Sequence, residues 1–264
     1  MRQRHLSVAL ALVVVVLGAA GPALAQTDEI QVYTAEIADQ HVFNLTWHNN
    51  FVANGNTTPA FPGAVVANKS WNGVPEWAYG VAKWFEAGLY MPLYSRDNEQ
   101  GWGLNGFKLR ALFVEPDAAD RTFVYGTNFE FSVNAKRWDA SRFSSEVRPI
   151  VGWHLNQWDI IVNPILDTEY DGFANLDFAP CTRLAFNPSK SVAVALEEYD
   201  DFGPIKGFHA ASDQVHQLYG VFDLTGKAVD VEFGVGVGLT SASDKLTFKL
   251  ILSRDLNKVS PPSK

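Results

Sequence analysis

Two basic residues, Lys108 and Arg110, stand two positions apart in the segment KLRALFV (108–114). Side chains two residues apart in a β-strand point to the same face, about 7 Å from each other. The other face of this segment is apolar, so the two cations share a polar face. In a confined space they would repel each other unless carboxylates lie between them, and Glu86 and Glu130 are the nearest candidates on the neighbouring predicted strands. The spacing therefore predicts a site built on ion pairs.

The same alternation places further charged residues on the polar faces of other segments. The full candidate set is Glu86, Lys108, Arg110, Glu130, Arg148, Asp177, Arg183, Glu232 and Lys249. If these faces enclose a common space, two interpretations fit. Acids and bases pair across the space, hold its wall rigid and partly plug it, because buried charges need partners. Alternatively, the five bases form a ladder opposed by carboxylates that orients a polar or amphipathic solute as it passes.

Such a site needs elements that stay polar on one side and apolar on the other over a long distance. In residues 121–134, apolar and aromatic side chains alternate with Gly, Asn, Glu and Ser, and residues 228–239 repeat the pattern with glycines on the polar side. Alternation over ten or more residues exceeds the usual strand length of a soluble protein. We therefore expect long β-strands and few helices.

Alternation of this kind predicts twelve strands, an even number, as single-chain bacterial barrels have. They are expected at 41–53, 73–80, 84–95, 102–114, 121–134, 146–154, 158–166, 172–186, 190–200, 213–223, 228–239 and 245–255. The connections alternate between short turns and longer polar loops, such as 54–72 and 201–212. In membrane barrels the short turns lie on the periplasmic side and the long loops outside.

Composition narrows the class of protein. The chain has 264 residues, 47% of them hydrophobic, and a formal net charge of −8. Residues 1–25 read as a signal peptide, since Arg2 and Arg4 precede an apolar run and an A-x-A site ends at Ala25. Its removal takes away two arginines and no acid, so the charge becomes −10 and a nucleic-acid binder is excluded. We expect one domain at 26–257 with a short periplasmic N-terminal segment, then a polar tail at 258–264.

Two architectures use this alternation. A soluble β-sandwich, as in a secreted lectin or enzyme, buries its apolar faces between two sheets but has shorter strands. A closed barrel turns its apolar face to lipid and leaves no strand edge unpaired. Aromatic residues gather near strand ends, as the two headgroup girdles of a membrane barrel require. They include Trp71, Trp77, Tyr79, Trp84, Phe85, Tyr90, Tyr94, Trp102, Trp153, Trp158 and Phe186. The sequence predicts an all-β, closed antiparallel transmembrane β-barrel of about twelve strands.

Two segments carry a resemblance to a known family. They are the hairpin with Tyr79, Gly80 and Trp84, and the stretch GVGVGLTSASDKLTFKL at 234–250. With strings such as NPILDTEYDGFANLDFAPCTR (163–183), they resemble a family of Gram-negative outer-membrane β-barrels described as transporters, similar in style to the barrels of phenol and aromatic-degradation pathways. The resemblance implies outer-membrane location and, for the solute, hydrophobic or aromatic compounds.

Other chemistries find little support in the sequence. An outer-membrane hydrolase needs Ser and His within reach on one strand, whereas His209 and Ser212 fall in a predicted loop. The remaining histidines are scattered, so we expect no metal site, no cofactor and no catalytic residues. The single cysteine, Cys181, cannot form an internal disulfide and is expected as a small residue among charged side chains.

We therefore expect a monomeric barrel in contact with outer-membrane lipid that passes small solutes passively. One alternative is a plugged barrel with a structural or binding role and no transport. The other is the soluble sandwich. The sequence does not identify the solute, and it leaves open whether the interior is open or plugged.

Overall fold

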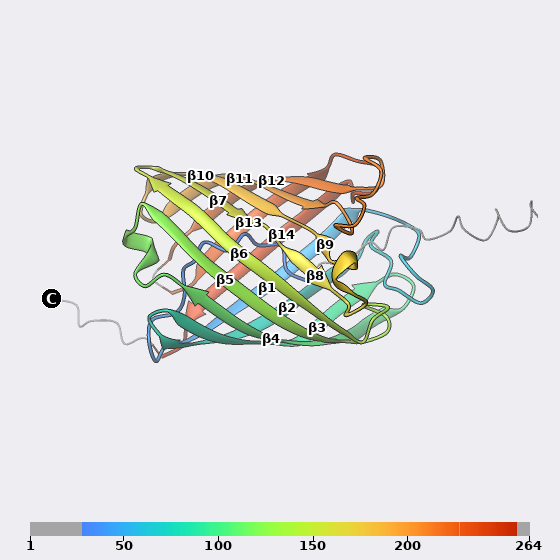
Figure 1. Cartoon of the computed structure of the whole chain (residues 1–264), viewed down its shortest axis with the longest axis horizontal. Helices are drawn as coiled ribbons and strands as arrows, with labels where there is room; N and C mark the ends of the chain where they lie inside the picture. Colours follow the sequence, from blue (N-terminus) through green and yellow to red (C-terminus); the bar gives the residue numbers. More distant parts are fainter. Residues whose placement is uncertain (1–27, 227, 258–264) are drawn as a thin grey trace, which may run out of the picture.

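The computed structural model describes residues 28–226 and 228–257, which form one closed barrel (Figure 1). The predicted signal peptide 1–25 and polar tail 258–264 lie outside the described residues. Within the described part of the chain, the helical elements are two short 3-10 turns, η1 (Ala118–Asp120) and η2 (Phe173–Asn175). No helix in these ranges is long and apolar enough to cross a membrane.

Antiparallel pairing runs around the whole wall in the order β5-β4-β3-β2-β1-β14-β13-β12-β11-β10-β7-β6, and β6 pairs back onto β5. The strands are β1 (Phe43–Asn54), β2 (Trp71–Ala82), β3 (Phe85–Asp97), β4 (Gly101–Val114), β5 (Phe123–Asn134), β6 (Phe143–Leu155), β7 (Trp158–Asn163), β8 (Leu166–Thr168), β9 (Asp177–Phe178), β10 (Cys181–Ser189), β11 (Val192–Asp201), β12 (Val215–Leu224), β13 (Asp230–Gly238) and β14 (Leu246–Asp255). Short turns gather at one rim and longer loops at the other (Figure 1). The prediction of a closed twelve-stranded barrel is confirmed, and the sandwich alternative is wrong.

Two of the twelve predicted strands are interrupted. The strand expected at 158–166 becomes β7 and β8, separated around Pro164, and both pieces pair with β6. The strand expected at 172–186 is reduced to β9 and β10, separated by Ala179 and Pro180. Proline has no N–H to donate to a neighbouring strand, so each one breaks the ladder at its position. The wall is therefore discontinuous in one sector while remaining closed elsewhere.

The two faces of the wall differ as the alternation predicts. Along β5, Phe129 is 45% exposed on the outer face, while its neighbour Asn128 is fully buried inside. Large exposed apolar residues recur on many of the other strands, from Trp47 of β1 to Phe233 of β13. One aromatic residue departs from the predicted girdles. Tyr90 is fully buried inside the barrel, because it lies on the face of β3 opposite to the exposed Met91.

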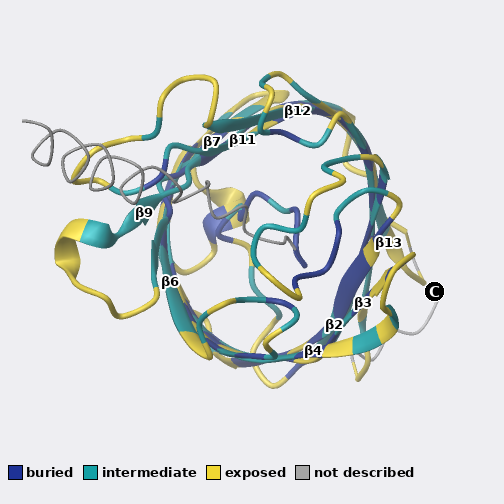
Figure 2. Ribbon diagram, turned by 90° about the vertical axis from the view of Figure 1, so that its right-hand side faces the viewer, coloured by how far each residue is buried: buried dark blue, intermediate teal, exposed yellow. Residues whose placement is uncertain are grey.

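Residues 28–42, which we call the plug, run through the inside of the barrel, as the blue trace in Figure 1 shows, and the view of Figure 2 shows chain inside the ring of strands. Val32, Tyr33 and Ala35 are at least 95% buried and pack against inward-facing residues of the wall such as Leu112 and Ile150. The expected short N-terminal extension is thus part of the core. Its apolar side chains are removed from water by packing against apolar side chains of the inner wall.

Candidate functional site

The interior charges form two clusters, of which the first surrounds Arg110. The Arg110 guanidinium lies 2.6 Å from Glu76 and also contacts Glu86. Glu76 in turn lies 3.3 Å from Nε2 of His48, whose side chain is fully buried. Strands β1, β2, β3 and β4 supply these four residues, so the cluster joins four neighbouring strands.

The first cluster continues through Lys108 and Arg148. Lys108 lies 2.9 Å from Asp28 of the plug and 3.5 Å from Glu130 of β5. Arg148 donates two hydrogen bonds to Glu146, at 2.7 and 3.0 Å, and lies 3.7 Å from Glu29 of the plug. Both bases therefore connect the wall to the plug.

The second cluster lies on β10 to β14. The fully buried Lys249 ammonium is 2.5 Å from Glu197 and 2.5 Å from Glu232. Arg183 contacts Glu197 and Asp223, and lies 3.9 Å from Glu232. Each base shares its acids with the other, which satisfies the strong requirement of buried charges for partners.

All nine residues of the sequence-based set face the interior, but they do not form one basic ladder. Lys108, Arg110 and Arg148 belong to the first cluster, and Arg183 and Lys249 to the second. Glu86, Glu130 and Glu232 serve as their partners. Asp177 stands apart, with no ion-pair partner among the described residues. The acids of the plug, Asp28 and Glu29, were missed because their place beside β4 and β6 depends on contacts far apart in sequence.

Hydrogen bonds join the plug to the wall at several positions along the plug. Asn163 of β7 accepts from the Tyr33 amide at 2.7 Å and donates to the Tyr33 carbonyl at 3.0 Å. Lys249 donates to the Ile30 carbonyl at 3.2 Å, and Arg148 to the Gln31 carbonyl at 3.0 Å. Near the short-turn rim, the Ala38 amide donates to Glu86 at 2.6 Å. Much of the plug backbone is therefore satisfied by side chains of the wall.

A cavity of about 310 Å³, which we call the vestibule, lies between the plug and the long loops. Residues 28–31 line it together with residues of the loops 55–70 and 135–142 and of the strands around the wall discontinuity. Its lining includes only two bases, Lys108 and Arg148. The acids that line it are Asp28, Glu29, Glu130, Asp139, Glu146, Asp167, Glu169, Asp177, Asp200 and Asp201.

Four of these acids form a continuous row across the wall, which we call the acidic row. Glu130 of β5 lies opposite Glu146 of β6 in the strand register. Glu146 also lies opposite Asp167 of β8, and Asp167 lies opposite Asp177 of β9. Directly opposite residues in an antiparallel pair have Cβ atoms about 4.5–5.5 Å apart, and like charges at that separation are destabilising. Lys108 and Arg148 neutralise the Glu130 and Glu146 end of the row. Asp167 and Asp177 have no basic partner within 4 Å among the described residues.

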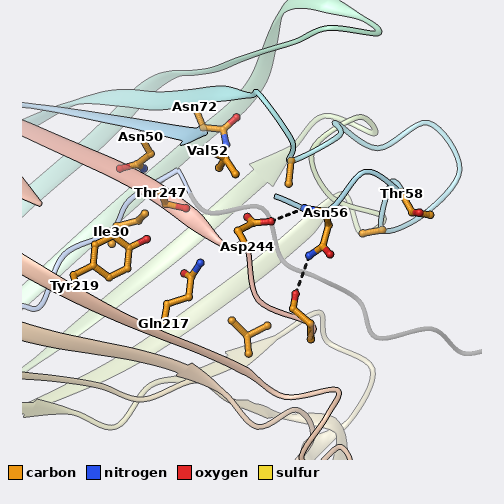
Figure 3. A pocket seen from close by; sticks show the side chains of 14 residues that line it. Ile30, Asn50, Val52, Asn56, Thr58, Asn72, Gln217, Tyr219, Asp244 and Thr247 are labelled. Carbon is orange, nitrogen blue, oxygen red and sulfur yellow. Dashed lines mark hydrogen bonds between the residues drawn. The ribbon is translucent and has the colours of Figure 1, made fainter. Parts of the chain in front are cut away.

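A second pocket, of about 70 Å³, shares Ile30, Val215 and Gln217 with the vestibule (Figure 3). Its lining is mostly uncharged and includes Asn50, Asn72 and Gln217 together with Ile30 of the plug. Asn56 from the loop after β1 closes it by donating hydrogen bonds to Asp244 and to the Ala242 carbonyl, each at 2.8 Å. Asp244 is the one acid among the residues that line this pocket, whereas ten acids line the vestibule.

Burial changes the protonation of acids on the plug and the loops. Burial, followed by the nearby charge of Glu130, raises the pKa of Glu29 to about 7. Burial likewise raises the pKa of Asp139 in the loop after β5. Desolvation disfavours the charged form of a carboxyl group, and a nearby positive charge counters it only in part.

The residues that could bind a metal ion or act as a nucleophile already contact other side chains. Glu198, Asp200 and His216 place their ligand atoms within 4.8 Å of one another, a grouping that the scattered histidines did not predict. Both ring nitrogens of His216 already face oxygen acceptors, Asp200 at 2.5 Å and Gln214 at 3.1 Å. Cys181 is buried with its sulfur 3.6 Å from Oδ1 of Asn163.

The fold is shared with solved outer-membrane barrels. The COG4313 outer membrane channel from Pseudomonas putida F1 superposes with a TM-score of 0.59 at 10% sequence identity, over 86% of this chain and 100% of that one. The NanC porin superposes with a TM-score of 0.53 at 6% identity, over 81% of this chain and 100% of that one. No protein-family model and no curated protein matches the sequence. At these identities the likeness shows a common fold.

Proposed function

We propose that this protein is an outer-membrane channel for small solutes whose path is closed, in the described state, by its own plug. The observation that carries the proposal is the vestibule, a cavity of about 310 Å³ bounded by the long loops on one side and by residues 28–31 on the other. A cavity of that size suits one small organic molecule. The solved barrels of the same fold are described as a channel and a porin, which supports the same function.

The plug sets how the channel opens. It lies inside the barrel between the short-turn rim and the vestibule, so we expect a solute to pass only when some contacts between plug and wall are released. These contacts are hydrogen bonds and ion pairs to side chains, and none of them is needed to close the ladder of strands. The plug can therefore move while the wall stays intact.

Aromatic side chains line the vestibule beside the acids and favour a solute with an apolar part. Phe61, Trp138 and Tyr199 line the vestibule together with Ile165 and Val215. A solute with a small apolar body would bury it against these residues, which supports the hydrophobic or aromatic preference implied by the sequence resemblance. We propose this preference for part of the solute, since carboxylates occupy the rest of the lining.

A second candidate function is a plugged barrel with a binding or structural role. Two ion-pair clusters and several plug-to-wall hydrogen bonds favour it, because each must be broken or rearranged for passage. In either case we expect a monomer in the outer membrane, since the ladder closes around the wall and, among the described residues, leaves only short strand edges at the wall discontinuity.

Conductance of the purified protein in planar bilayers tests the proposal. We expect small single-channel currents from the wild type, and currents at least threefold larger from a variant that lacks residues 28–36. The variant Asp120→Asn, an exposed change in η1 outside the barrel interior, is the matched control. Faster migration of unheated than boiled samples on a gel checks that each variant forms a closed barrel.

Two outcomes would contradict the proposal. If neither the wild type nor the deletion variant conducts although both fold, the protein is not a channel and the second candidate holds. If the wild type conducts as well as the deletion variant, the plug does not close the path.

A further inference from the structure

We infer that the vestibule is a binding site for small organic cations that carry an ammonium group on an apolar body. The inferred binding stands on the geometry of the vestibule alone. Its extension, that such cations are the solutes that pass, rests on the proposed channel function.

The unpaired half of the acidic row provides the first argument. Asp167 and Asp177 are direct register partners on β8 and β9, and neither has an ion-pair partner among the described residues. Two ionised carboxylates in this arrangement repel each other, and either a shared proton or a positive charge between them relieves the repulsion. Lys108 and Arg148 fulfil that role at the other end of the row, where Glu130 and Glu146 lie. An incoming cation would do the same for Asp167 and Asp177.

An acid of the plug provides a second, independent argument. Glu29 is only 7% exposed and lines the vestibule. Neither of its carboxylate oxygens accepts a hydrogen bond. Its nearest base is Arg148, at 3.7 Å. Buried polar atoms without a hydrogen bond are uncommon, and Arg148 at this distance gives Glu29 an ion pair but no hydrogen bond. An ammonium group has three N–H donors, which the ionised carboxylates of Glu29 and of the acidic row accept.

The remaining lining favours an organic cation over a hydrated metal ion. The indole of Trp138 and the ring of Tyr199 line the same cavity as the acids. Aromatic rings attract organic cations and also bury apolar surface. Ca²⁺ takes six to eight closely spaced oxygen ligands, and Mg²⁺ keeps several waters and gains nothing from aromatic rings. The vestibule instead has acids distributed around a space large enough for a small molecule.

Titration calorimetry of the detergent-solubilised protein at low salt tests the inference with three probes of one shape. These are phenethylammonium, neutral 2-phenylethanol and anionic 3-phenylpropionate. We expect the cation to bind at least tenfold more tightly than the other two. The double variant Asp167→Asn, Asp177→Asn should lose at least tenfold in affinity for the cation, whereas Asp120→Asn should not change it.

A melting curve separates a binding role from a structural one. Neutralising two opposed carboxylates removes a repulsion, so the double variant should melt at the same temperature as the wild type or higher while binding less. Loss of binding together with a lower melting temperature would assign Asp167 and Asp177 to the structure of the wall and overturn the inference. Equal binding of all three probes, or tighter binding of Mg²⁺ than of phenethylammonium, would overturn it as well.

Permeation through liposomes distinguishes failure of the inference from failure of the proposed channel. Charge-selective binding without permeation, even after residues 28–36 are deleted, would uphold the binding site and refute the channel. Permeation of all three probes at equal rates, without charge-selective binding, would refute the inferred site and leave the channel in place.

Discussion

Replacing Lys249 by methionine should destabilise the barrel more than most single changes. The Lys249 side chain is fully buried, and its ammonium group lies 2.5 Å from both Glu197 and Glu232. It also donates to the carbonyl of Ile30 in the plug, at 3.2 Å. Methionine fills a similar volume without charge, so the change removes the cation and leaves the packing nearly intact.

The expected loss of unfolding free energy depends on which basic partners Glu197 and Glu232 retain. Glu197 retains its contact with Arg183, but the nearest remaining base to Glu232 is Arg183 at 3.9 Å. Removing one partner of a buried ion pair costs about 3–5 kcal/mol. Because Arg183 still neutralises part of the cluster, we expect the free energy of unfolding to fall by about 3 kcal/mol. Adding Glu232→Gln should restore about 1 kcal/mol or more, since it removes the carboxylate left without a close partner.

Urea unfolding and refolding in lipid vesicles, followed by tryptophan fluorescence, measures these differences. The matched control is Lys83→Met, because Lys83 forms an exposed pair with Asp117 at 3.2 Å. Exposed pairs contribute under about 1 kcal/mol. If Lys249→Met loses no more than this control, the cluster does not stabilise the barrel and the interior charges are effectively solvated.

Three further outcomes follow. Phe129→Arg, on the outer face, should lower the unfolding free energy in vesicles by about 2–4 kcal/mol, and an unchanged value would mean that this face does not meet lipid. Asn128→Arg, one residue away, should also destabilise the barrel, because Asn128 is fully buried and donates to Glu130 at 2.9 Å; wild-type stability in the same assay would show that the site is open to water. Since burial and the charge of Glu130 raise the pKa of Glu29 from 4.5 to about 7, the folded state binds more protons, and its stability should fall as pH rises from about 4.5 to about 7. Glu29→Gln should flatten that pH dependence of the urea midpoint, and an identical slope would contradict the assignment.

The wall was predictable because its pattern is local. Alternation along a segment such as 121–134 shows directly which side chains lie on each face of the strand. A register shift of one residue would turn the polar side chains toward lipid, so the register is fixed. The interior was less predictable because it depends on pairs far apart in the chain. Tyr33 and Asn163, separated by 130 positions, bond only after the barrel has closed.

Alternation does not show how far water enters the interior. Asn128 lies on the polar face of the segment 121–134, yet it is fully buried in the folded barrel. Glu86 and Glu130 were correctly expected beside Arg110 and Lys108, because neighbouring strands put them within reach. The acidic row was not predicted, since it requires the exact register of four strands across a break at Pro164.

The meeting of β1 and β14 has a practical consequence. Asn44 and Asp255 are register partners, and the plug leaves the wall at Val42, next to the same rim. A linker from residue 257 to residue 43, with new chain ends placed in a short turn, would therefore yield a circularly permuted wall without its plug. Residues 28–42 can then be supplied as a separate synthetic peptide. Titrating that peptide into the barrel without its plug would then measure, as a dissociation constant, how strongly the plug binds the wall.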